Sequence, residues 1–276
     1  MAGEAKTSAF MLGTATVMLG PQADVFNLTP DEHSIGLVKN FAVTAEPNYL
    51  DLTQGVRNTI VYSVLTAFPV RATMEVYEYT SKNIAYGLSL EGFNYTSKAA
   101  SVPLGNSLAG GASATSVDVP VASDISAQFK AGDWITIQEQ AGGRDLVHIA
   151  KLTSDGSYTA GGSGGTLKLT FTNHPIPADV SFSALARVRA QNMIGIGEKK
   201  EQPFFGAKVV GLLPEGNEPI TLIYPKVRIL RGFNLSFSTE NYGNMPFEFT
   251  PFELTSQDPH YATFRDLGVG MLLTGN

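Results

Sequence analysis

The residue types that most often perform catalysis or bind metals are few in this sequence and lie far apart. The chain has no cysteine, which excludes disulfides, thiolate metal sites, iron–sulfur clusters and cysteine nucleophiles. None of the four histidines stands at metal-ligand spacing from another histidine or from a carboxylate on an obvious helix. These histidines are His33, His148, His174 and His260. The sequence therefore predicts no metal site.

Two short patterns resemble catalytic or cofactor motifs but lack essential parts. Glu75 and Glu78 are three residues apart on an expected strand, so their carboxylates point to opposite faces and do not form an acid–base pair. Gly195-Ile196-Gly197 begins like a dinucleotide-binding loop, but Glu198-Lys199-Lys200 follows in place of a third glycine and a helix. We therefore expect no catalytic residues, no cofactor and no enzymatic activity.

The composition favours an all-β protein with little charge. The 276 residues include 28 glycines and 15 prolines, which favours turns over long helices. Charged residues make up 16% of the chain, below the value of about 25% that is usual in globular domains. No apolar run is long enough to span a bilayer, and the N-terminus lacks the features of a secretory signal. We expect a protein made in the cytoplasm whose surface is partly covered by other copies of itself.

The charge distribution divides the chain into two domains. Residues 97–191 carry 7 basic and 7 acidic side chains, so the net charge of -6 lies entirely in the flanking segments. Stretches rich in small residues lie near the start of this neutral block, at residues 105–116, and within it, at residues 159–165. Such stretches are typical of flexible joints. We predict a small inserted β-rich domain over residues 96–191. The flanks, 1–95 and 192–276, are predicted to form one discontinuous β-sandwich or barrel with one packed helix.

Alternating apolar residues predict strands in both domains. The pattern is found over Val70–Val76, Val117–Val121, Leu167–Phe171 and Phe233–Phe237. One helix is expected over Lys82–Leu90, with Ser81 as its N-cap.

The segment Asn241–Glu253 combines three phenylalanines with two prolines and has two interpretations. The phenylalanines are consistent with a core strand. The prolines are consistent with an edge strand whose apolar surface contacts another subunit, because prolines within sheets are confined to strand ends and edges.

The order of elements between Lys39 and Leu90 resembles a known family. A strand and a long polar loop cover Lys39–Gly55, and the chain returns through Ile60–Val64 to a strand at Pro69–Tyr79 and the expected helix. Together with an aromatic-rich C-terminal half, this order resembles the major tail-tube proteins of tailed bacteriophages. The resemblance covers both flanks and is a pattern of strands and loops.

The resemblance implies a structural protein of the virion tail. Such proteins form hexameric rings whose inner sheets join into one barrel, and the rings stack into a tube that conducts DNA from the capsid to the host cell. The implied partners are further copies of the chain, tail terminator, baseplate or tail-tip proteins, a tape measure protein and possibly a sheath. Genomic DNA would pass through without specific binding, and residues 96–191 would be an Ig-like or SH3-like decoration.

The resemblance also assigns roles to particular residues. The N-terminal arm Met1–Ala9 and an inter-ring loop match the segments that reach a neighbouring ring. The loop residues are Ala45, Glu46, Pro47, Asn48, Tyr49, Leu50, Asp51, Leu52, Thr53, Gln54 and Gly55. Alternation along the following strand places Arg71, Thr73 and Glu75 on its polar face, which we expect to line the channel. The acidic excess of the flanks predicts a wall that repels phosphates.

Two other functions remain as alternatives. The inserted domain could be a carbohydrate- or receptor-binding module of the virion surface with Trp134 as a stacking platform, but the sequence favours packing of Trp134 within a small β-domain after Gly132-Asp133. A hydrolase that acts on the cell envelope would require residues such as Asp133 and His148, but the sequence offers no base–nucleophile set to accompany them.

Overall fold

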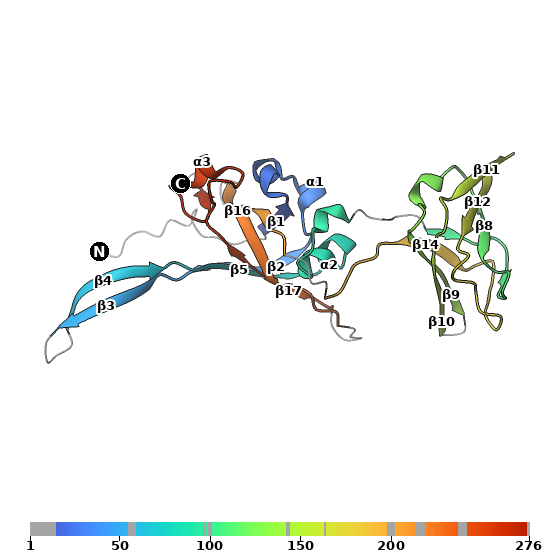
Figure 1. Cartoon of the computed structure of the whole chain (residues 1–276), viewed down its shortest axis with the longest axis horizontal. Coiled ribbons are helices and arrows are strands. Elements are labelled where there is room, and N and C mark those ends of the chain that lie inside the picture. Colours follow the sequence, from blue (N-terminus) through green and yellow to red (C-terminus); the bar gives the residue numbers. More distant parts are fainter. Residues whose placement is uncertain are drawn as a thin grey trace. The chain divides into compact units, whose positions relative to one another are not determined.

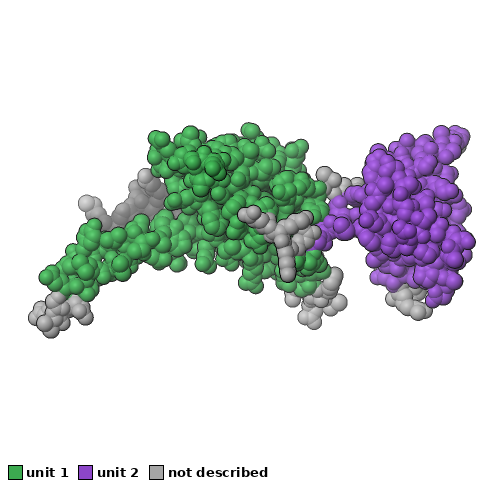
Figure 2. Space-filling view, in the orientation of Figure 1, with its two compact units in different colours: residues 1–96, 196–276 green, residues 97–195 purple. Residues whose placement is uncertain are grey.

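The chain folds into two compact units, seen in the computed structural model (Figure 1). The structure describes residues 15–54, 59–95, 98, 101–141, 144–162, 164–197, 202–212, 219–236 and 242–274. Unit 1 comprises residues 1–96 and 196–276, and unit 2 comprises residues 97–195 (Figure 2). The boundaries expected from charge lie within four residues of this division. Strands account for 48% and helical segments for 12%, which confirms the all-β class.

Unit 1 is built on one antiparallel sheet of seven strands, as far as the described residues extend. The sheet does not close into a barrel. Its strand order is β1 (Ala15–Gly20), β15 (Phe205–Leu212), β16 (Pro219–Arg231), β17 (Met245–Pro251), β5 (Val70–Val76) and β2 (Val38–Ala45), with β18 (Met271–Leu273) also paired to β16.

The main core of unit 1 lies on one face of this sheet. Strand β5 buries Val70, Ala72, Met74 and Val76 while its alternate residues face outward, as the sequence pattern predicts. Strand β17 buries Met245, Phe247 and Phe249 and is paired on both sides, with β16 and β5. The alternative of an edge strand in Asn241–Glu253 is therefore wrong. The prolines are tolerated because Pro251 ends β17 and Pro246 lies one residue after its start.

Helix α2 (Ser81–Gly87) packs on this core through the buried Tyr86, whose hydroxyl donates to the Leu19 carbonyl oxygen at 2.9 Å. The helix is shorter than predicted and its N-cap is Thr80, whose Oγ1 accepts from the Asn83 N–H at 3.1 Å. It ends at Gly87, where an added Cβ would lie 2.7 Å from the Gly232 carbonyl oxygen. Only glycine permits this approach of the helix to the end of β16.

Other helical segments of unit 1 are short. They are η2 (Gln22–Asn27), α1 (Pro30–His33), η3 (Gly92–Asn94) and α3 (Tyr261–Phe264). Val25 and Phe264 from these segments join Met18 and Ile223 in a smaller apolar cluster.

Asn83 joins helix α2 to two segments that lack regular hydrogen bonding. Its buried side-chain amide donates to the carbonyl oxygens of Ile35 and Glu78, both at 2.8 Å. We expect Asn83→Ala to lower the free energy of unfolding by about 1–3 kcal/mol, because the buried Ile35 carbonyl group and the partly buried Glu78 carbonyl group both lose their donor. Urea denaturation measures this loss. Asn94→Ala is the control, since among the described residues the Asn94 side-chain amide bonds only to the exposed Glu91 carboxylate. Equal stability of the two variants would contradict the prediction.

Unit 2 contains two larger sheets that share one core. The first has the order β10 (Arg144–Lys151), β9 (Trp134–Ala141), β14 (Arg187–Gln191) and β6 (Ser101–Pro103). The second has the order β11 (Ser157–Gly161), β12 (Gly164–Thr170) and β8 (Ser116–Val121). Two further strands, β13 (Ser181–Phe182) and β7 (Leu108–Ala109), pair with each other, and η4 (Ser126–Gln128) precedes β9. Phe129, Phe171 and Phe182 fill the core.

One predicted strand is absent. The described part of Phe233–Phe237 has no regular secondary structure, because β16 ends at Arg231; Phe237 lies outside the described residues.

Candidate functional site

The most unusual feature of unit 1 is an exposed β-hairpin formed by β3 (Asn48–Gln54) and β4 (Thr59–Ala67), called the arm below (Figure 1). It follows β2 and leads into β5. Every residue of both strands is exposed. The sequence interpretation of a long polar loop here is wrong, because Asn48–Gln54 pairs along its length with Thr59–Ala67.

The predicted inter-ring residues fall at the base and on one strand of the arm. Ala45 ends β2, and the Glu46 N–H donates to the Pro69 carbonyl oxygen at 3.2 Å, which joins the base of the arm to the start of β5. Pro47 lies between β2 and β3, and the next seven residues form β3. Gly55 and the N-terminal arm Met1–Ala9 lie outside the described residues.

Both faces of the arm expose large apolar side chains, but only one of them has an apolar group unbroken by a polar pair at its centre. Register pairs Leu50 with Val64 and Leu52 with Tyr62, and residues directly opposite each other lie on the same face. The exposed fractions of these side chains are 68%, 45%, 62% and 64% respectively. The four form an apolar patch, called the arm patch below. On the other face the Ser63 hydroxyl donates to Asp51 Oδ1 at 2.5 Å, between flanking apolar residues.

The arm patch is costly for an isolated chain. A two-stranded hairpin is at best marginally stable in water, and contiguous exposed apolar side chains mark contact surfaces. Complete burial of one leucine contributes roughly 1.5–3 kcal/mol. The arm therefore has the composition of a segment that is buried by a partner.

The three residues expected to line a channel share the face of β5 opposite the core. Arg71 and Thr73 are exposed and Glu75 is half-buried. Arg71 Nη1 lies 3.5 Å from Glu248 Oε1 on the neighbouring strand β17. The Tyr77 hydroxyl donates to Glu75 Oε2 at 2.8 Å, and Lys39 lies over the Tyr77 ring.

This polar face carries both signs of charge. The Tyr77 hydroxyl and, to a smaller extent, the Asn40 side chain lower the pKa of Glu75, so that its carboxyl is ionised at neutral pH. Lys39 stands directly opposite Glu75 on β2, and Arg71 pairs with Glu248. The acidic excess of unit 1 is thus not concentrated on these strands, unlike the expectation of an acidic wall. Summed segment charge does not reveal which side chains share a face.

The histidines and the residues named for a hydrolase have separate structural partners. His33 Nδ1 lies 3.2 Å from the Thr29 N–H, and His260 Nε2 lies 2.8 Å from the Ala23 carbonyl oxygen. Asp133 Oδ2 lies 2.7 Å from Lys98 Nζ, whereas His148 Nε2 lies 3.0 Å from the His174 carbonyl oxygen. Within the described chain, no three His, Asp or Glu side chains are grouped so that they could hold a metal ion. None of the described helices is long and apolar enough to cross a membrane.

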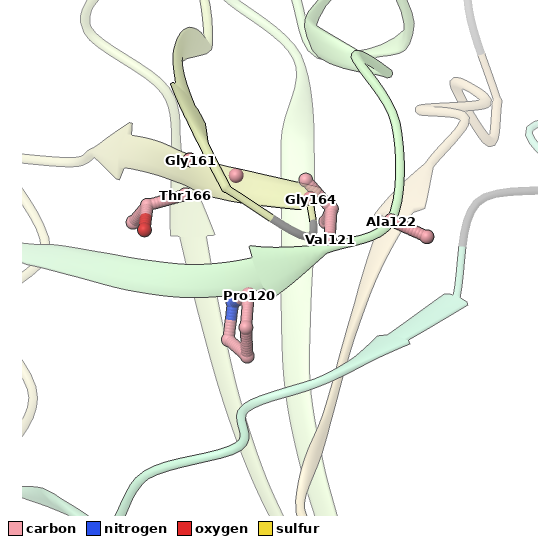
Figure 3. A pocket seen from close by; sticks show the side chains of 7 residues that line it. Pro120, Val121, Ala122, Gly161, Gly164 and Thr166 are labelled. Atoms are coloured by element: carbon pink, nitrogen blue, oxygen red, sulfur yellow. The ribbon is translucent and has the colours of Figure 1, made fainter.

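Unit 2 offers a partly exposed Trp134 and an open hollow. The Trp134 indole N–H points to Met193 Sδ at 3.2 Å, and its ring centroid lies 5.5 Å from that of His174. The hollow, about 460 Å³, lies where β8, β11 and β12 meet and is lined by small residues such as Pro120, Gly164 and Thr166 (Figure 3). It has no charged lining residue, so it offers little to orient a ligand.

No protein-family model matches this chain, and no curated protein matches it in sequence.

Proposed function

We propose that this chain is the structural protein of a bacteriophage tail tube, in which hexameric rings stack around a channel for DNA. The observation that carries the proposal is the arm, whose two strands are exposed on both faces and yet are rich in large apolar residues. In a single chain the apolar side chains of this hairpin stay in contact with water, whereas a stacked assembly would bury them.

In the proposed tube, the arm reaches the neighbouring ring and the arm patch supplies the contact. Within a ring, β2 supplies a second contact, because in the described sheet it pairs only with β5 and its other edge can accept a strand. Joining edges between six protomers would give one continuous barrel with no free strand edges. The edge of β2 would then join the protomers within one ring, and the arm patch would join one ring to the next.

The polar face of β2, β5 and β17 would line the channel, with Arg71, Thr73 and Glu75 among the lining residues. Neighbouring opposite charges such as Lys39 and Glu75 largely cancel beyond a Debye length of about 10 Å. DNA phosphates would therefore meet a wall with a weak net field and without a cluster of cations, which would keep contacts with DNA brief. This proposed role requires no catalytic group or cofactor.

The proposed location is the tail of the virion, after synthesis in the host cytoplasm. Proteins that end or fill such a tube are the proposed further partners: a tail terminator, baseplate or tail-tip proteins, a tape measure protein and possibly a sheath. Unit 2 would be a decoration on the tube.

Negative-stain electron microscopy of the purified full chain tests this function. We expect tubes, or rings with six-fold symmetry, because both contact surfaces belong to the same chain. The proposal fails if the folded protein remains monomeric at every concentration that can be reached. Analytical ultracentrifugation of the same sample distinguishes ordered assembly from aggregation.

A further inference from the structure

A second hollow in unit 2 has a chemistry that the proposed tube does not use. It has a volume of about 410 Å³ and is lined by Gln138 and Glu139 of β9, by Leu185, and by Arg187 and Arg189 of β14. Small-molecule sites usually have volumes of about 300–1,000 Å³. The two arginines alternate with buried residues along β14, so they share its outer face, and Gln138 lies directly opposite Arg187.

The two guanidinium groups differ in the hydrogen bonds that they make. Arg187 Nε donates to Ser101 Oγ at 2.9 Å and its Nη2 donates to the Ser101 carbonyl oxygen at 2.8 Å. These bonds orient the Arg187 guanidinium and leave Nη1 available. The Arg189 side chain has no hydrogen bond or ion pair with any residue in the described ranges. An unpaired guanidinium beside an oriented one suits a carboxylate, which accepts two parallel N–H bonds.

The Glu139 carboxylate belongs to the other face of β9. Glu139 stands opposite the partly buried Leu146, whereas Gln138 stands opposite the exposed Val147, so Gln138 alone of the two shares the face of Arg187 and Arg189. The Ser183 hydroxyl and the Ser183 N–H, which lies 2.6 Å from Glu139 Oε2, lower the pKa of the Glu139 carboxyl. The face of the hollow that carries the arginines therefore presents two cations and favours an anionic ligand.

The remaining groups fit a polyhydroxylated ligand. The Gln138 side-chain amide offers both an acceptor oxygen and a donor for hydroxyl groups. Leu185 is 86% exposed and gives the hollow an apolar rim on which the C–H face of a sugar ring can pack. We infer that this hollow binds an acidic saccharide, with the sugar carboxylate on Arg189 and Arg187 and its hydroxyls on Gln138. This inference does not depend on tube formation.

Saturation-transfer difference NMR on the full chain, with glucuronate as the probe, tests the site. This measurement suits weak ligands and works for monomers and assemblies alike. We expect glucuronate to receive saturation and to bind at least about tenfold more tightly than glucose, which lacks the carboxylate, or acetate, which lacks the hydroxyls. Binding of acetate as tight as that of glucuronate would overturn the assignment to a saccharide. Absence of glucuronate binding would overturn the site.

Variants locate the binding. Arg189→Gln removes the unpaired guanidinium from an exposed position, and we expect a loss of glucuronate affinity of about tenfold or more. Lys168→Gln is the matched control, because it removes one positive charge from β12, in the other sheet of unit 2, and should leave affinity unchanged. Thermal unfolding verifies that both variants fold. Equal affinities of Arg189→Gln and the unsubstituted chain would contradict the proposed position of the carboxylate.

Discussion

Replacing Leu50 and Leu52 together with serine is expected to yield folded protomers that no longer stack into tubes. Both side chains belong to the arm patch, and no residue of the arm is buried in the chain itself. Folding of unit 1 should be unaffected because its core lies on the seven-stranded sheet. Each leucine buried in an assembled contact contributes roughly 1.5–3 kcal/mol, and the loss is repeated at every protomer of a ring. Electron microscopy of the double variant should show rings or monomers in place of tubes.

Three comparisons make this result specific. Leu185→Ser removes an exposed leucine from unit 2 and should leave tubes intact. Asp51→Asn changes the other face of the arm and tests whether the Ser63 contact contributes to stacking. Equal melting temperatures of the double variant and the original chain would show that the protomer is unaffected. Tubes of normal length from the double variant would disprove the role of the arm patch.

The largest effect on stability is expected from Phe249→Ala. Phe249 is fully buried on β17 between β16 and β5, and its ring centroid lies 6.0 Å from that of Tyr224. Removing a buried phenylalanine side chain costs about 3–5 kcal/mol, because apolar burial is lost and a cavity remains. Typical domains are stable by only about 5–15 kcal/mol, so unit 1 of this variant would be close to unfolding at room temperature.

Urea denaturation followed by far-ultraviolet circular dichroism measures this loss. Leu230→Ala on the adjacent strand β16 is the control, since Leu230 is exposed and its truncation should change the free energy of unfolding by less than about 0.5 kcal/mol. A loss below about 1 kcal/mol for Phe249→Ala would mean that β17 does not carry the core of unit 1.

Strands with a clear alternation of apolar and polar residues were predictable. Val70–Val76 and Val117–Val121 fall on β5 and β8, because a half-buried strand needs its buried residues two positions apart. Phe233–Phe237 has the same alternation, but its described part forms no strand. Local pattern indicates that a segment can pair; it does not indicate whether a neighbour with free hydrogen-bonding groups lies beside it.

The candidate site was predicted in position and not in structure. The segment Ala45–Gly55 was singled out, but its partner strand Thr59–Ala67 was not recognised, because both strands are apolar on more than one face. Residues exposed on both sides do not follow the rule of alternation that a half-buried sheet obeys. The arginine hollow was missed as well. Arg187 and Arg189 showed the spacing of one strand face, but Gln138 and Glu139 are about fifty positions away in the chain.

The sequence by itself determined the all-β class, the division into two domains and the absence of thiol chemistry. These properties follow from composition and local periodicity, which do not depend on distant residues. Only the tertiary structure decided that β17 is central, that the arm is a hairpin and that the outward face of β5 carries both charges. Pairing and burial are decided by residues far apart in the chain, so a segment's own residues do not specify them.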